Sequence, residues 1–177
     1  SNICTAQVLP AVLASMYAVY HGPQGLTRIA QRVARFTAIL ARGLQQMGYE
    51  IVNTHAFDSI TVKTDDASDL IAARAHSAGA NLRFRLKNHL GISLDETTTR
   101  GDIEMLWSFF VKPGEPMPRL GELEDTVDSL IPADLRRSSA FLTHPVFNTH
   151  HSETGMLRYI RQLSDKDLAL DRSMIPL

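Results

Sequence analysis

The strongest pattern in the sequence is a repeat of apolar residues between positions 26 and 47. The side chains recur mostly at steps of three or four residues: Leu26, Ile29, Ala30, Val33, Phe36, Leu40, Leu44 and Met47. This spacing gathers them on one face of an α-helix, which indicates a helix packed against a core. Gly48 follows the last of them and predicts the end of that helix.

Arginines occupy the opposite face of this predicted helix, namely Arg28, Arg32, Arg35 and Arg42. A row of guanidinium groups can bind an anion, but most charged helix faces simply meet water. We therefore interpret this face as solvated surface.

An earlier helix is predicted over residues 5–20. Thr5 can cap its first turn, and Gly22 and Pro23 predict its end because proline interrupts helical hydrogen bonding. Its apolar face would comprise Val8, Val12, Met16, Val19 and Tyr20.

Short strands are predicted in the middle of the chain. Residues 49–53 and 59–64 are expected to pair with each other. Residues 82–87 alternate apolar and basic side chains, turn at 88–91 and continue into a strand at 92–94. The alternation predicts a half-buried strand, with its apolar side chains Leu82, Phe84 and Leu86 facing the core.

Two short helices accompany these strands. Asp65 or Asp66 is expected to cap the first, which runs through His76. A threonine run at 97–99 with Asp102 opens the second, which buries Ile103, Leu106, Trp107 and Phe110. Strands joined by hairpins and single helices predict an α+β domain, with a mixed or antiparallel sheet covered by helices.

The character of the sequence changes after Lys112. Three prolines within residues 113–118 exclude a helix or a central strand there and indicate a linker. Short elements are predicted at 122–130 and 136–142. We place the domain boundary at about 112–120, with residues 1–112 on one side and residues 113–177, an extended connector, on the other.

A polar stretch from His144 to Leu163 holds three of the seven histidines. His144, His150 and His151 allow three interpretations: a metal site, hydrogen bonds across a packed joint between domains, or the rim of an active site completed by another segment. Adjacent side chains such as those of His150 and His151 diverge, which disfavours a shared metal ion. We favour the joint, with Ser152 capping a helix at 153–163 whose apolar face comprises Met156, Leu157, Ile160 and Leu163.

Composition and missing motifs exclude several classes of protein. The formal net charge of −1 argues against general attraction to nucleic acid or membrane surfaces, and no apolar run reaches the ~18–20 residues of a membrane span. Cys4 is the only cysteine, so no intrachain disulfide forms. GxSxG, GxGxxG and Walker motifs are absent, and none of Lys63, Lys87, Lys112 and Lys166 has the context of a Schiff-base nucleophile. From its residues alone the chain is not a complete enzyme.

Several stretches together resemble the P-protein of the glycine cleavage system. They are residues 1–7, 16–23, 91–99, 141–154, which contains the run Asn-Thr-His-His-Ser-Glu-Thr, and 167–177. The resemblance covers nearly the whole chain, and 141–154 and 167–177 carry it most specifically. Both ends of the chain are expected to be cuts through a longer polypeptide.

The resemblance implies an internal fragment of a pyridoxal-phosphate-dependent glycine dehydrogenase, which decarboxylates glycine. Residues 1–112 would include the small C-terminal domain of a first, catalytically degenerate half with the architecture of fold-type-I transferases. Residues 113–177 would lead into the second, catalytic half. The lysine that binds the cofactor would lie outside this chain, so no catalytic, cofactor-binding or metal-binding residue is expected in it, and the fragment itself would be structural and inactive.

One position departs from the wider pattern of fold-type-I enzymes. Their small domains often carry, just before an Ile-Ser strand, an arginine that holds the substrate carboxylate, whereas this sequence has Gly91 there. A glycine cannot form the bidentate contact that arginine makes with a carboxylate. The departure therefore supports a structural role for this half.

The same resemblance implies the surroundings of the chain. Its partners would be the remaining halves of the enzyme, which is expected to form a dimer, and the lipoylated H-protein, whose lipoyl arm receives the aminomethyl group. The location would be the bacterial cytoplasm or, in a eukaryote, the mitochondrial matrix. His150, His151 and Ser152 would lie at a domain joint or at the rim of the active site. The alternative is a stand-alone protein-interaction module without enzymatic activity.

Overall fold

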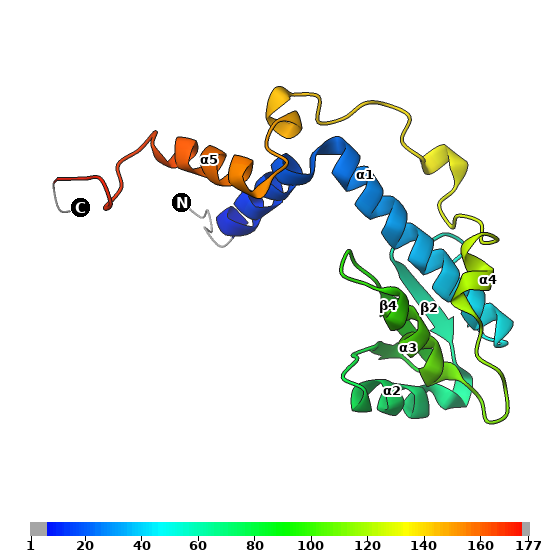
Figure 1. Cartoon of the computed structure of the whole chain (residues 1–177). Helices are drawn as coiled ribbons and strands as arrows, with labels where there is room; N and C mark the ends of the chain where they lie inside the picture. Colours follow the sequence, from blue (N-terminus) through cyan, green and yellow to red (C-terminus); the bar gives the residue numbers. More distant parts are fainter. Residues whose placement is uncertain (1–6, 175–177) are drawn as a thin grey trace. The chain divides into compact units, whose positions relative to one another are not determined.

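The computed structural model describes residues 7–174 and divides the chain into two compact units. The core unit is Ile29–Arg137, and the end unit combines Ser1–Arg28 with Ser138–Leu177. Each is described by itself below. Figure 1 shows the elements in chain order.

The first helix, α1, runs over Val8–Gln46 and is interrupted at Gly22, whose φ of 61° and ψ of −179° are not helical. Two separate helices were expected, but the chain resumes its helix at once, with Pro23 in the first position after the break. Proline is tolerated there because an N–H at the start of a helical segment has no partner to lose. Gly48, with φ of 82°, ends α1 as predicted. The expected capping residue Thr5 lies outside the described residues.

Antiparallel pairing joins four strands of the core unit into one sheet. The strands are β1 (Glu50–Ile51), β2 (Ser59–Lys63), β3 (Arg83–Leu86) and β4 (His89–Ser93), in the order β1-β2-β4-β3. Ile60 pairs with Ile92 and Val62 with Leu90, and these four side chains are buried on the same face. The predicted α+β class with an antiparallel sheet is confirmed.

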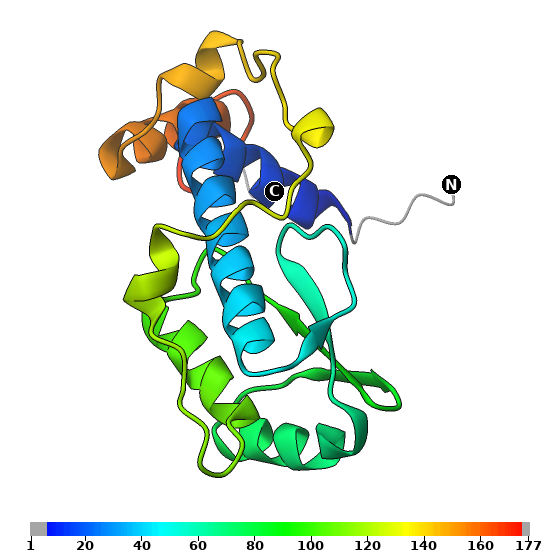
Figure 2. The same cartoon turned by 90° about the vertical axis from the view of Figure 1, so that its right-hand side faces the viewer.

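Helices cover that face of the sheet. The layer consists of the C-terminal part of α1, α2 (Ser68–Ser77), α3 (Arg100–Phe110) and the short α4 (Leu120–Glu124). Figure 2 shows α1 running along the sheet, with α2 and α3 beside it. Trp107 lies at the centre of the core with no exposed surface, and its Nε1–H donates to the Leu40 carbonyl at 3.1 Å. The stripe of Ile103, Leu106, Trp107 and Phe110 is buried as predicted.

The starts of α2 and α3 differ in how well the sequence predicted them. The threonine run 97–99 opens α3 as expected, and within it Thr99 is the N-cap and forms a capping box with Asp102. The prediction that Asp65 or Asp66 caps α2 was wrong. Residues Asp65–Ala67 form a 3₁₀ turn (η2), and the N-cap of α2 is Ala67, which makes no side-chain capping hydrogen bond. The buried hydroxyl of Ser68 instead pairs with the hydroxyl of Thr64 at 2.6 Å. Gly79, with φ of 79°, follows the end of α2.

Strand β3 buries its apolar side only in part: Leu82, just before the strand, packs against the core as predicted, whereas Phe84 does not. The strand lies at the edge of the sheet, pairs only with β4 and has a register shift between Arg83 and Leu86. Phe84 is 51% exposed. The side chains of Arg85 and Leu86 lie outside the described part of the structure.

Of the four arginines predicted to face solvent on α1, Arg28 and Arg42 are exposed as predicted, whereas Arg32 and Arg35 bind backbone carbonyls. Arg32 donates hydrogen bonds to the carbonyls of Glu96 and Thr98 at 2.9 and 2.7 Å. Arg35 donates to the carbonyls of Glu124 and Val127. These guanidinium groups hold loops of the core unit, so they serve neither as free surface charge nor as an anion site.

The segment after α3 is largely irregular. Residues 113–118 form neither helix nor strand, as expected, but the predicted acidic helix is reduced to α4 and the element at 136–142 does not form. Pro132 precedes a single 3₁₀ turn, η3 (Ala133–Leu135). In the end unit, η4 (Pro145–Asn148) precedes α5 (Glu153–Ser164). The proposed boundary at 112–120 concerns the halves of a longer enzyme and stays a prediction.

Candidate functional site

The candidate residues His150, His151 and Ser152 link η4 to α5 within the end unit. Ser152 caps α5 as predicted, because its hydroxyl accepts a hydrogen bond from the Gly155 N–H at 3.1 Å. A serine hydroxyl at this position satisfies one of the amides that the first helical turn leaves unpaired. Its role here is to fix the start of a helix.

His151 connects this loop to the interruption of α1. Its Nδ1 lies 2.7 Å from the carbonyl oxygen of Tyr20, so the ring carries its proton on Nδ1 and donates it to that oxygen. The carbonyl is available because the helical ladder is broken two residues later, at Gly22. A Cβ at Gly22 would lie 2.6 Å from both His151 Cε1 and the Phe147 carbonyl oxygen. Only glycine fits there.

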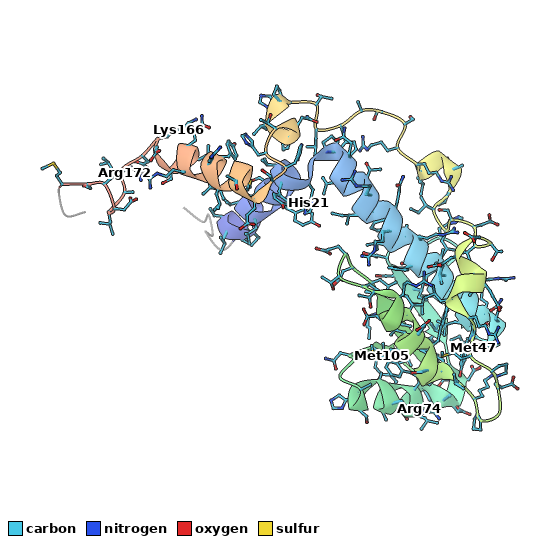
Figure 3. The ribbon with its side chains drawn as sticks, viewed as in Figure 1. His21, Met47, Arg74, Met105, Lys166 and Arg172 are labelled. Atoms are coloured by element: carbon cyan, nitrogen blue, oxygen red, sulfur yellow. The ribbon has the colours of Figure 1, made fainter. Side chains whose placement is uncertain are left out.

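The other histidines of the end unit also make local structural contacts. The ring of His150 stacks on Tyr159 of α5, with centroids 4.3 Å apart and an interplanar angle of 15°. His144 Nδ1 accepts a hydrogen bond from the Val146 N–H at 3.2 Å and so caps η4. His21, labelled in Figure 3, packs against Tyr17 and Tyr20 on α1.

Hydrogen bonding to the backbone and ring stacking explain how these histidines are held. His144 and His151 each use Nδ1 in a hydrogen bond to the backbone. Within residues 7–174 no group of three or more His, Cys, Asp or Glu side chains is arranged to hold a metal ion.

The four lysines differ in their surroundings. Lys63 forms an exposed ion pair with Glu50 at 3.5 Å, and Lys112 lies over the ring of Tyr49, 5.0 Å from its centroid. Lys87 and Lys166 are exposed, the latter following α5 (Figure 3). Lys63 and Lys112 line a cleft of about 380 Å³, which they share with the carboxylates of Glu50, Asp65 and Asp66. A Schiff-base lysine usually lies in a desolvated pocket.

Gly91 lies beneath an arginine of the neighbouring strand. A Cβ at this position would lie 2.4 Å from Nε of Arg83, whose guanidinium continues to the Thr61 hydroxyl at 3.1 Å. The glycine therefore makes room for a cross-strand arginine on the polar face of the sheet. No sequence pattern indicated this contact, because it depends on the pairing of Arg83 with Gly91 across two strands.

Shifted pKa values occur at structural hydrogen bonds in the core unit. Hydrogen bonds from the Thr97 hydroxyl and amide lower the pKa of Asp95, and those from Thr99 lower the pKa of Asp102. Burial raises the pKa of Tyr49, partly opposed by the charge of Arg74, and the Tyr49 hydroxyl donates to the Phe110 carbonyl at 2.8 Å. Each of these shifts is explained by a cap, a turn or a buried hydroxyl.

In the end unit, ion pairs of Arg161 account for the shifts. Hydrogen bonding to Arg161 lowers the pKa of Asp171, and the same contact, together with the charge of Asp165, raises the pKa of Arg161. The Arg161 Nη1–Asp171 Oδ2 distance is 2.8 Å, and all three side chains are exposed. These groups stabilise the turn after α5.

A cleft of about 720 Å³ lies in the end unit beside the resumed part of α1. Its lining mixes hydroxyl and amide side chains and the guanidinium of Arg28 with the apolar residues Pro23, Ala140, Phe141 and Leu142. This lining can hold polar groups or a chain segment. It contains no carboxylate, imidazole or amine for acid–base or covalent catalysis.

Sequence reasoning singled out His150, His151 and Ser152 but missed the residues that these side chains contact. His151 contacts Tyr20 and Gly22, and His150 stacks on Tyr159. The residues His151 and Tyr20 are 131 positions apart in the sequence. The signal was available only in part: the Gly22–Pro23 pair predicted an interruption, which frees a carbonyl, but nothing indicated which side chain would reach it.

Comparisons with known proteins agree with one another. The family model for the glycine cleavage system P-protein matches residues 1–110. A curated relative from Variovorax paradoxus, named glycine dehydrogenase (decarboxylating), is 73% identical over all 177 residues. A relative of the same name from Cupriavidus metallidurans is 56% identical over the same length. The chain spans 18% of the length of each of these relatives.

Proposed function

The chain belongs to the glycine cleavage system P-protein family, and we propose that it forms a structural part of a longer glycine dehydrogenase (decarboxylating). The observation that carries the proposal is identity of 73% along the whole chain to a protein of that name more than five times its length. The four lysines, each exposed or paired with another side chain, support a role without covalent catalysis.

The finer architecture is part of the same proposal. We place the sheet and its helices in the small C-terminal domain of a fold-type-I half, and residues 113–177 in a connector to a catalytic half. Two features support this: the sheet is covered on one face by helices, and the segment after α3 is largely irregular. Pyridoxal phosphate, bound elsewhere in the longer protein, would supply the electron sink for decarboxylation.

The residues of the joint would position the connector. His151 attaches it to the interruption of α1, His150 packs on α5 and Ser152 starts that helix. Each makes its contact within the end unit and none holds a group poised for proton transfer to a ligand. We therefore propose that they act as a domain joint and do not take part in the reaction.

Partners and location follow from the family. The longer protein would form a dimer and pass an aminomethyl group to the lipoyl arm of an H-protein. Its relatives are bacterial, which supports a place in the bacterial cytoplasm. In the described part of the chain no helix combines the length and apolar character needed to cross a membrane.

The test is a set of lysine variants in the longer protein. Lys63→Ala, Lys87→Ala, Lys112→Ala and Lys166→Ala are each expected to keep the visible absorbance of lysine-bound cofactor and the release of labelled carbon dioxide from glycine within about twofold. The isolated chain should develop no such band when cofactor is added.

Two results would contradict the proposal. A lysine variant that folds normally but loses the absorbance band would place the cofactor in this chain. A longer protein that neither binds the cofactor nor releases carbon dioxide would remove the enzymatic role and favour an interaction module.

A further inference from the structure

The first part of α1 exposes an unusually apolar surface. Leu9 is 66% exposed and Leu13 61%, and other large apolar side chains join them: Val8, Val12, Tyr17 and Tyr20. Of the large apolar residues in this stretch, Val19 is the one that is fully buried. At 100° per residue these side chains cover about half of the helix circumference.

Charge is missing from the same stretch. Residues 1–27 contain no Asp, Glu, Lys or Arg, and Arg28 is the first charged side chain of the sequence. Free protein surfaces carry charged groups, whereas the buried centres of interfaces are depleted of them and rich in aliphatic and aromatic side chains. The described turns from Val8 to Tyr20 therefore have the composition of a covered helix.

Helix α5 shows a weaker form of the same property. Leu157 is 61% exposed and Ile160 46%, and none of its residues is buried. Its opposite side carries polar and charged side chains, including Arg158 and Gln162. A helix that is apolar on one side and charged on the other needs cover on one side only.

We infer that residues 8–20 of α1 and the apolar side of α5 are an interface covered by the part of the longer protein that this chain does not contain. The inference rests on the proposed function, since that protein supplies the cover. Its relatives contain more than four-fifths of their length beyond the matched segment. A cover in the same polypeptide acts at high effective concentration and needs no association in solution. It is therefore favoured over a second copy of the chain.

Hydrogen exchange in the longer protein and in the isolated chain tests the inference. Backbone amides of residues 8–20 should exchange at least about tenfold more slowly in the longer protein, because a docked helix opens less often. Amides of β2 and β4 should exchange at similar rates in both. Equal exchange of residues 8–20 in the two proteins would overturn the inference.

A matched pair of variants tests whether residues 8–20 are the covered surface. Leu13→Glu places a charge on the proposed interface, and Leu70→Glu places one on α2, where a leucine is 56% exposed within the core unit. Glutamate is a good helix former, so neither change breaks its own helix. In the longer protein Leu13→Glu should raise exchange at residues 8–20 by about tenfold or more, while Leu70→Glu should leave it unchanged.

The remaining outcomes are also decisive. Identical behaviour of the two variants would show that residues 8–20 are not covered. A stable dimer of the isolated chain that protects residues 8–20 as strongly as the longer protein does would assign the surface to a second copy. If the longer protein protects these residues but does not release carbon dioxide from glycine, the interface stands and the proposed enzymatic function fails.

Discussion

The two units of the chain handle their apolar side chains in opposite ways. The core unit collects apolar side chains from α1, α2, α3, α4 and the sheet in a single buried cluster. The end unit has Val19 as its one large apolar side chain that is fully buried among the described residues, and leaves Leu9, Leu13 and Leu157 exposed. The same helix, α1, contributes to both. An apolar repeat therefore indicates a buried face, but the partner that buries it need not belong to the same piece of chain.

Truncation of leucine on the two parts of α1 should give the largest contrast. Leu40→Ala removes a side chain with 0% exposure and leaves a cavity, so it should lower the free energy of unfolding by about 2–5 kcal/mol. Leu13→Ala removes one that is 61% exposed and should change it by less than about 0.5 kcal/mol. Urea unfolding of the isolated chain, followed by Trp107 fluorescence, measures both. Equal losses would mean that the end unit is part of the same cooperative core.

Gly43 offers the next contrast. A Cβ at Gly43 would lie 2.3 Å from the ring of Trp107, which is fully buried and cannot move aside. Gly43→Ala should therefore destabilise the core unit by about 1–3 kcal/mol. Gly101→Ala in α3 meets only the Thr99 hydroxyl, at 3.7 Å, and should be neutral or stabilising by up to about 1 kcal/mol. A stabilising Gly43→Ala would show that the packing of α1 on Trp107 is looser than described.

The two hydroxyl caps extend the comparison to single helices. Thr99→Ala removes the capping box of α3 and should cost the core unit about 1 kcal/mol in the fluorescence transition. Ser152→Ala removes the cap of α5 and should leave that transition unchanged, while helical circular dichroism decreases slightly. If Ser152→Ala shifted the fluorescence midpoint as far as Thr99→Ala, the stabilities of the two units would be coupled.

The smallest expected effect is on the stability of the core unit at acidic pH. Hydrogen bonds from Thr99 lower the pKa of Asp102 in the folded state, so the ionised carboxylate stabilises α3. This contribution is fully present above the ordinary aspartate pKa of about 3.9 and is lost as the pH falls through the lower folded value. Asp102→Asn should flatten the acid side of the stability profile, and Thr99→Ala should flatten the same part. A native-like profile in Asp102→Asn would assign the acid sensitivity to other carboxylates.

Local signals explain what the sequence predicted well. The capping box of Thr99 and Asp102, the stripe ending at Phe110 and the cap at Ser152 each depend on residues a few positions apart. The prolines of 113–118 act through the backbone alone. Such features form in nearly any tertiary context, and the structure contains all of them.

Long-range geometry explains the rest. The alternation around Phe84 was correct as a strand pattern, but the position of β3 at the sheet edge left that side chain exposed. The fit of His151 against Gly22 joins two distant segments, and no local pattern predicts it. We infer that the exposed apolar side chains on the first part of α1 pack against residues outside this sequence, so no pattern within it identifies their partner.

The placement of the aromatic residues has a consequence for spectroscopy. Trp107 is the only tryptophan and belongs to the core unit, whereas Tyr17, Tyr20 and Tyr159, three of the four tyrosines, belong to the end unit. Emission excited at the red edge of absorption therefore reports only the helix-covered sheet. Tyrosine signals report mainly the other part. The unfolding of the two units can therefore be followed separately through the tryptophan and tyrosine signals of the chain itself, without an added label.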